Sequence, residues 1–252
     1  MPKRRPEPTP DGAPEGAPGR VPGRARPTPP ETLPERCVRA ALAIIDAEGV
    51  EALSLREVAR RLGVSHQAPY KHFASRDHLL AEVVRRAFEA FARHLDARDA
   101  GATADEDLGA MGRAYLAYAH THPLQYRLMF GTPLPDPAEH PAMMASARHA
   151  FALLRVGLTR MHAEAGRVLP GDAVDQDAVF VWGTLHGLAS VRHAPALRTL
   201  GLSAAVLAGA EVRALAGVGA ALAAGAPPGG APEDGGRAVT TKATRPRRSR
   251  AR

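Results

Sequence analysis

Residues 54–73 constrain the fold more than any other part of the sequence. Apolar residues at helical spacing fill the first half of this stretch, and Gly63 follows where the chain must turn with a positive φ. The small residue Ala59 precedes Gly63 by about one helical turn, and the apolar Val64 follows it directly. Two short helices can cross steeply when their contact residue is small. The stretch therefore predicts a helix, a tight turn and a second short helix beginning at Ser65.

Apolar residues recur at helical spacing through the rest of the chain, and no stretch alternates as a β-strand would. We expect a helix at residues 33–48, ended by Gly49, and a long helix capped by Ser75 that reaches about residue 98. Further helices are expected at residues 55–62, 104–120, 123–130, 141–165, 172–193 and 201–223. With the short helix at Ser65, these make nine helices in an all-α fold.

Composition divides the chain into four segments. Residues 1–30 contain ten prolines and almost no large apolar side chains, and residues 225–252 are dominated by Pro, Gly and Arg. Such segments cannot bury enough apolar surface to offset the loss of chain entropy, so we expect two disordered tails. Between them we expect an N-terminal three-helix domain at residues 31–91 and a C-terminal helical bundle at residues 92–224.

The net charge of +7 belongs to the tails. Residues 1–30 hold six Lys or Arg against three acidic residues, and residues 225–252 hold seven against two, which leaves residues 31–224 nearly neutral. A neutral core argues against a protein that coats nucleic acid and favours binding through a small local patch. The basic end at residues 242–252 either holds DNA non-specifically or is a solvated tail.

The sequence offers no signature of catalysis or metal binding. Cys37 is the single cysteine, which excludes an intrachain disulfide and a Cys-based zinc site. His120 and His122 point apart on a helix, and no other histidine pair is completed by a carboxylate or thiol. A phosphate-binding glycine loop and a nucleophile elbow are also missing. We therefore expect no enzyme, no metal and no cofactor.

The sequence also carries no sign of export or membrane insertion. The N-terminus lacks an apolar stretch followed by a cleavage site. The most apolar stretch, residues 200–224, consists mainly of Ala and Gly and is interrupted by Glu211 and Arg213. This is too weakly apolar for a membrane span, so we expect a cytoplasmic protein without a membrane partner.

Residues 33–95 resemble the N-terminal helix-turn-helix domain of TetR-type transcriptional regulators. The resemblance rests on residues 40–49 (AALAIIDAEG), 54–59 (SLREVA), 63–65 (GVS), 70–73 (YKHF) and 75–79 (SRDHL). One departure is Pro69, where much of the family has a residue with an amide donor. We expect Pro69 to remove about one hydrogen bond from the helix without breaking it.

The resemblance implies which residues contact DNA. The short helix at Ser65 would enter the major groove and read bases through His66, Gln67 and Ala68. Gln67 can form a bidentate contact with adenine, and Ala68 suits a thymine methyl group. Phosphate contacts are implied for Ser54, Arg56, Tyr70, Lys71, His72 and Arg76. Two alternatives stay open: Tyr70 could belong to the core, and Lys71 could be a surface lysine without a role.

Residues 181–189 resemble the Trp-His-Gly class of C-terminal domains within the same family, and residues 115–130 resemble that class too. The resemblance implies a dimer interface built from the last two helices of each subunit, in which Gly183 and Gly187 allow close approach. A sensor domain also needs a cavity, and Met and aromatic side chains adapt to irregular ligands. The candidate lining is Tyr115, Tyr118, Met129, Phe130, Met143, Met144, Phe151, Phe180 and Trp182, unless these are plain core residues.

Together these features predict a ligand-responsive transcriptional regulator, a repressor that binds palindromic double-stranded operator DNA as a homodimer. A small apolar effector in the bundle would release the DNA. An enzyme is one rival hypothesis, and a partner-binding helical protein without DNA affinity is the other. The basic and hydroxyl residues around the expected recognition helix favour the regulator.

Overall fold

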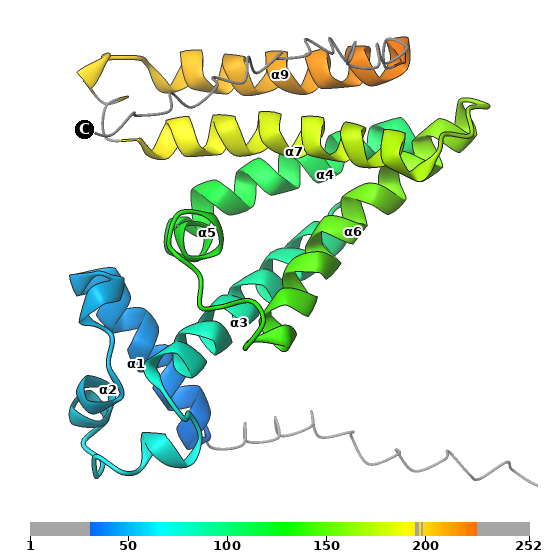
Figure 1. Cartoon of the computed structure of the whole chain (residues 1–252). Helices are drawn as coiled ribbons and strands as arrows, with labels where there is room; N and C mark the ends of the chain where they lie inside the picture. The colour runs from blue at the N-terminus through cyan, green and yellow to red at the C-terminus, as the bar shows by residue number, and fades with distance from the viewer. Residues whose placement is uncertain (1–30, 195–196, 198, 226–252) are drawn as a thin grey trace, which may run out of the picture.

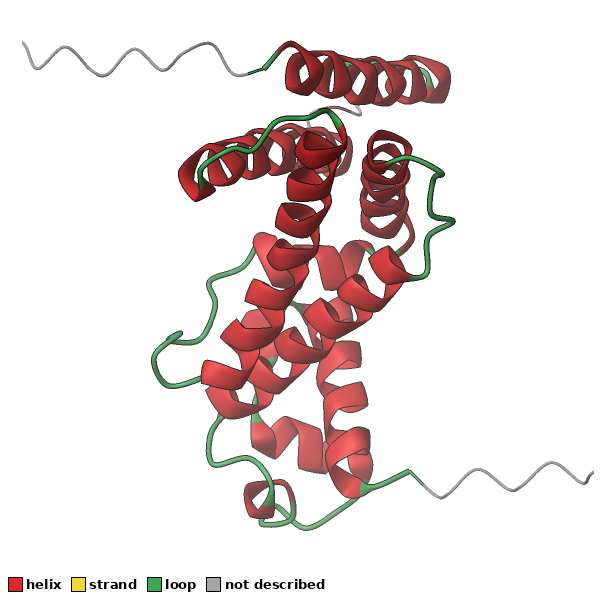
Figure 2. Ribbon diagram, turned by 90° about the vertical axis from the view of Figure 1, so that its right-hand side faces the viewer, coloured by secondary structure: helices red, strands yellow, loops and turns green. Residues whose placement is uncertain are grey.

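The computed structural model describes residues 31–194, 197 and 199–225, so the expected tails lie outside it except for Gly225. Eight α-helices and two 3-10 turns follow one another in this part of the chain, without a strand (Figure 2). They are α1 (Leu33–Glu48), η1 (Val50–Ala52), α2 (Leu55–Leu62), η2 (Pro69–Lys71), α3 (Arg76–Asp96), α4 (Ala104–Thr121), α5 (Pro123–Phe130), α6 (Pro141–Glu164), α7 (Gly171–His193) and α9 (Ala204–Ala224). The expected all-α fold is confirmed.

Single residues set both ends of α2, which has the bounds that the sequence predicted. The Ser54 hydroxyl caps α2 by accepting the amide of Glu57 at 3.1 Å. Gly63 ends α2 in the left-handed conformation, with φ at 64°. A residue with a Cβ is strained at this φ, which is why glycine stands at the turn.

The segment after Gly63 differs from the prediction. Residues 66–68 form a turn that leads into the short 3-10 helix η2, and no α-helix begins at Ser65. The amides of Ala68 and Lys71 donate to carbonyls three residues back, at 3.0 and 3.3 Å. Pro69 has no N–H to donate to the Ser65 carbonyl, so the α-helical bond at this point cannot form. The expectation that Pro69 leaves this helix intact is therefore wrong, and the described residues form eight α-helices where nine were expected.

The helices form two connected parts (Figure 1). In the first, α1, α2 and η2 pack around the start of α3. In the second, α6 lies along α3, while α4, α5 and α7 complete the bundle and α9 covers the outer side of α7. The buried apolar side chains run as one cluster from α1 to α9, so α3 links the two parts through a common core.

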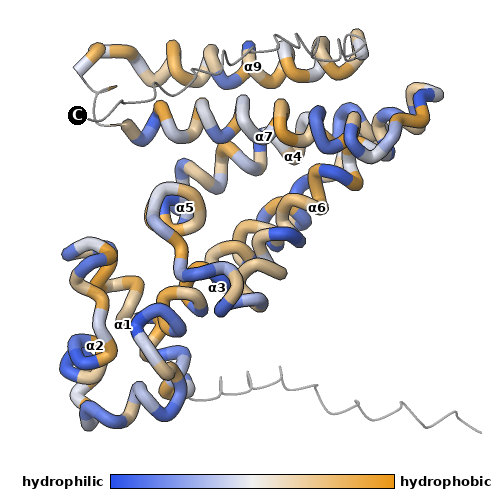
Figure 3. Tube along the Cα trace, in the orientation of Figure 1, coloured by the Kyte–Doolittle hydropathy of each residue, from blue (hydrophilic) through white to orange (hydrophobic). Residues whose placement is uncertain are grey.

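Helix α9 is apolar along its length but is barely buried (Figure 3). By length and composition it could span a membrane, which the sequence analysis did not expect. Only 11% of its most apolar window is buried in the subunit, and Val218 and Leu222 are its buried residues. Much of α9 is thus an apolar surface that its own subunit leaves uncovered.

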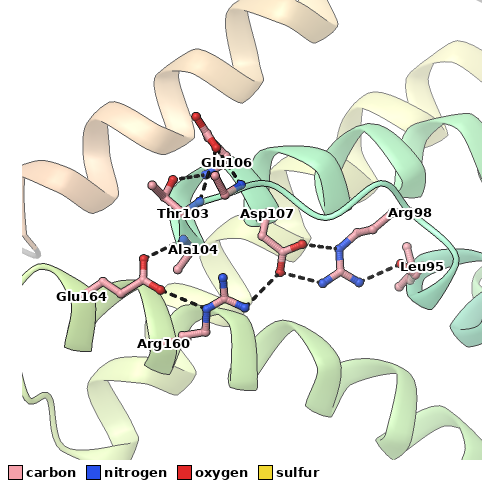
Figure 4. Close-up of polar contacts among 9 residues, drawn as sticks. Leu95, Arg98, Thr103, Ala104, Glu106, Asp107, Arg160 and Glu164 are labelled. Atoms are coloured by element: carbon pink, nitrogen blue, oxygen red, sulfur yellow. Dashed lines mark hydrogen bonds and ion pairs between the residues drawn. The ribbon is translucent and has the colours of Figure 1, made fainter.

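A polar clamp joins the end of α3 to α4 and α6 (Figure 4). The buried carboxylate of Asp107 accepts two hydrogen bonds from Arg98, at 2.9 and 2.8 Å. Arg160 lies 3.8 Å from the same carboxylate and donates to Glu164 at 3.1 Å. Glu164 in turn accepts the amide of Ala104 at the first turn of α4. The hydrogen bonds from Arg98 lower the pKa of Asp107, which keeps the clamp charged.

We expect Asp107→Asn to lower the free energy of unfolding by about 3 kcal/mol near pH 7, because Arg98 loses its buried partner. The pKa of Asp107 is lower in the folded than in the unfolded protein, so its ionisation stabilises the fold at pH values above the unfolded pKa. This stabilisation is lost as the pH falls through the folded pKa. The difference in free energy of unfolding between variant and wild type should therefore shrink below about pH 4. Urea unfolding at several pH values measures it, with the exposed Asp105→Asn as control. Equal effects of the two substitutions would contradict the role of the clamp.

Candidate nucleic-acid interface and ligand cavity

The side chains expected to contact DNA gather on one short turn. Pro69 and Phe73 are buried and anchor residues 66–72 to the small core. Ala68 is half-buried, and the other candidates on the turn are exposed: His66, Gln67, Tyr70, Lys71 and His72. The Tyr70 side chain is 50% exposed, so the alternative that it belongs to the core is wrong. The turn thus presents two imidazoles, an amide, a phenol and an ammonium group to solvent.

Arg56 adds a free cation beside this turn. It is exposed and forms no hydrogen bond or ion pair within the described residues. The neighbouring Arg60 and Arg61 differ because both donate to Glu57, at 2.6 to 3.0 Å. The hydrogen bond from Arg60, followed by that from Arg61, lowers the pKa of Glu57 to about 2. On α2, Arg56 is therefore the arginine whose charge is available to a phosphate.

Arg76 has a structural role that the sequence analysis missed. Its guanidinium donates to the carbonyls of Leu53 and Val50, at 3.1 and 2.9 Å, and to Asp77 at 3.0 Å. These bonds fasten the start of α3 to the linker between α1 and α2. Three of its five N–H groups are occupied inside the subunit.

A cavity of about 720 Å³ opens among α3, α4, α5, α6 and α7. Six of the expected residues line it: Tyr115, Met129, Phe130, Met144, Phe151 and Trp182. Phe88 and Phe91 of α3 line it as well. The sequence did not identify these two as cavity residues, because periodicity does not distinguish core from cavity wall.

Three expected lining residues are not part of the cavity. Tyr118 packs against α3, with its hydroxyl 3.4 Å from the Ala87 carbonyl, and Met143 is fully buried in the core. Phe180 is 46% exposed, on a different face of α7 from Trp182, because residues two apart on a helix diverge. Their assignment to the cavity is therefore corrected.

A hydrogen-bonded chain leads from the cavity wall to α7. The hydroxyls of Tyr115 and Tyr126 lie 2.9 Å apart, and Tyr126 lies 2.7 Å from Nδ1 of His186. Nε2 of His186 lies 3.3 Å from the Ser190 hydroxyl. Burial lowers the pKa of His186, so the ring is neutral near pH 7 and offers one nitrogen as donor and the other as acceptor. Burial also raises the pKa of Tyr115, which keeps its phenol neutral.

The two glycines expected at a dimer interface lie open on α7. A Cβ placed on Gly183 or Gly187 would meet no other atom of the subunit within 4 Å. Large apolar side chains are exposed on the same helix and on α9: Val179, Phe180, Val191, Val206 and Val212. Between helices α4 and α9 of one subunit the close approach is instead at Gly112, whose Cβ would lie 2.6 Å from Leu215. Sequence analysis did not single out Gly112.

Histidines do not gather into a metal site in the described part of the chain. No group of three or more His, Cys, Asp or Glu side chains there is arranged to hold a metal ion. His120 instead lies 3.2 Å from Glu211, and His162 lies 2.8 Å from Asp177.

Two family descriptions match the chain. "Bacterial regulatory proteins, tetR family" matches residues 38–83, and "Tetracyclin repressor-like, C-terminal domain" matches residues 108–215. A structure of a protein of unknown function from Rhodococcus sp. RHA1 superimposes with a TM-score of 0.61 at 27% identity. It covers 76% of this chain and 98% of its own.

Curated relatives agree with these matches. An HTH-type transcriptional regulator of Mycobacterium tuberculosis is 29% identical over 61% of this chain and 66% of its own length. The HTH-type transcriptional repressor DrrR1 of Streptomyces coeruleorubidus is 35% identical over 53% of this chain and 47% of its own. The chain therefore spans less than two-thirds of these relatives. With the helix-turn-helix geometry and both matched domains, the chain belongs to the TetR family of transcriptional regulators.

Proposed function

We propose that this protein is a ligand-responsive repressor that binds palindromic operator DNA as a homodimer in the cytoplasm. The observation that carries the proposal is the pairing of two features on one helix. The start of α3 is fastened to the linker between α1 and α2 and follows the exposed turn 66–72 along the chain, and its later turns supply Phe88 and Phe91 to the cavity wall. Nothing in this arrangement calls for catalysis, and the relatives are named as regulators.

The turn 66–72 would enter the major groove. His66, Gln67 and Ala68 would face base edges, because they stand first on the turn and are not needed for the core. Phosphates would be contacted by Ser54, Arg56, Tyr70, Lys71 and His72. We assign Arg76 chiefly to fixing this surface, and any phosphate contact it makes would use its remaining N–H groups.

The second copy would cover the apolar faces of α7 and α9. A four-helix contact of this kind places the same patch of both subunits around a twofold axis. It also gives the exposed apolar surface of α9 a protein partner rather than a membrane. Two recognition turns related by this axis could then reach major grooves about one DNA turn apart, roughly 34–36 Å.

Ligand binding would act through α3. This helix packs against α6, and both helices line the cavity. A ligand that separates α3 from α6 would tilt α3 and move the turn 66–72 that precedes it. The shift in DNA affinity cannot exceed the ligand's preference for the non-binding arrangement, typically about 1–3 kcal/mol.

We expect Gln67→Ala to relax base preference at one position of each operator half-site, by roughly 1–3 kcal/mol. Lys71→Gln should instead weaken all sequences alike and lower the slope of log K against log salt by about 0.9 for each lost contact. Sequencing of DNA selected from a random pool and salt titrations measure the two effects. Arg93→Gln, which changes an exposed arginine far along α3, is the control. An unchanged preference in the Gln67 variant would place the recognition surface elsewhere.

We expect Gly187→Leu to shift the protein toward monomer and to abolish operator binding. The Cβ of the new residue has open space within its own subunit, and leucine favours helix more than glycine does, so the subunit itself should fold. Sedimentation velocity and circular dichroism measure assembly and folding. Ala163→Leu, at an exposed position near the end of α6, is the matched control. A Gly187→Leu protein that stays dimeric would rule out this interface.

A further inference from the structure

The cavity wall is unusually rich in aromatic rings. Phe88, Phe91, Tyr115, Phe130, Phe151 and Trp182 all line it, out of eleven Phe, Tyr and Trp residues in the chain. Phe130 and Trp182 have ring centroids 6.0 Å apart, and Trp182 and Phe151 are 6.1 Å apart. Rings grouped in this way can accept a further ring against them in stacked or edge-to-face contact. A flat aromatic ligand fits such a wall better than a flexible aliphatic chain.

The cavity is also large enough for a ligand of this kind but holds no charge in its interior. Its volume of about 720 Å³ falls within the usual range for drug-sized ligands. The Tyr115 hydroxyl of the inner wall is neutral and is already hydrogen-bonded to Tyr126. A charged group of the ligand buried at this end would lack a partner, and that is costly. Any charge on the ligand must therefore lie at the rim.

The rim carries three charged lining residues, and one of them is unpaired. Arg148 and Arg155 stand seven residues apart on α6, which is close to two helical turns, so they share a face. Arg155 forms an ion pair with Asp175 of α7. Arg148 is exposed and has no hydrogen bond or ion pair to any residue in the described ranges. The available charge at the opening is thus positive, and a guanidinium binds carboxylates in bidentate fashion.

We propose that the effector of this cavity is a planar aromatic acid. Its rings lie among Phe130, Phe151 and Trp182, and its carboxylate binds the guanidinium of Arg148 at the rim. The proposal rests on the ligand-responsive function and adds the chemical class of the ligand. It excludes aromatic cations as the preferred class, because the one carboxylate at the rim, Asp175, is already paired with Arg155.

Three probes with one ring system test the charge preference: 2-naphthoate, 2-naphthamide and protonated 2-naphthylmethylamine. Trp182 is the single tryptophan of the chain and lines the cavity, so its emission reports occupancy directly. Calorimetry gives the affinities independently. We expect 2-naphthoate to quench Trp182 emission and to bind the full-length dimer about fivefold more tightly than the amide, as for an exposed ion pair. The amine should bind weakest.

Arg148→Gln should remove the preference for the acid and leave the affinity for 2-naphthamide unchanged. Arg113→Gln, at an exposed arginine of α4 outside the cavity lining, should keep the preference. Equal binding of acid and amide to the wild type, tighter binding of the amine, or no binding of any probe would overturn the proposal. Operator binding without ligand, measured on the same proteins, tests the regulatory function separately and should be the same in all three.

Discussion

The continuity of α3 is the constraint on which the rest of the structure depends. This 21-residue helix buries Leu79 and Leu80 near its start and Phe91 and Leu95 near its end, all within one apolar cluster. Arg76 fastens the start to the α1–α2 linker, and the Asp107 clamp holds the chain just beyond the end. Because both ends are fixed, we propose that a displacement at one end of the helix reaches the other end rather than being absorbed by a hinge.

The helices themselves were largely predictable from sequence. Their bounds depend on local chemistry, such as the cap at Ser54 and the positive φ of Gly63, which single residues specify. The turn after Gly63 was mispredicted because apolar spacing and a serine cap favour a helix there, while the missing amide of Pro69 favours a 3-10 turn. The local pattern thus favours two different structures, and the 3-10 turn forms because the α-helical hydrogen bond at Pro69 is missing.

The sites were only partly predictable, because they depend on how helices face one another. Spacing correctly placed Tyr115, Phe130 and Trp182 near the cavity, but it could not separate them from Tyr118 or Phe180, which face other neighbours. The hydrogen bonds of Arg76 to distant carbonyls have no counterpart in the sequence pattern at all. His66, Gln67 and Lys71 are exposed on the turn, as expected, while their contacts with DNA stay a prediction.

A chain of polar side chains connects the cavity to the dimer interface that we propose on α7, in addition to the apolar contacts. The chain from Tyr115 through Tyr126 to His186 ends at Ser190, on the helix that also carries Gly187. A neutral His186 can donate through one ring nitrogen and accept through the other, so it can connect Tyr126 to Ser190. We therefore expect that ligand contact with Tyr115 would displace α7, while contact with Phe88 and Phe91 would displace α3.

The coupling of cavity and DNA surface is the central claim, and thermodynamic linkage tests it most directly. The measurement is the affinity of 2-naphthoate for the free dimer and for the dimer saturated with operator DNA selected from a random pool. Coupling between the cavity and the DNA surface predicts that DNA weakens ligand binding by about 5- to 150-fold, and that the ligand weakens DNA binding by the same factor. Equal affinity for the free and the DNA-bound dimer, with the ligand shown to occupy the cavity by Trp182 emission, would contradict it.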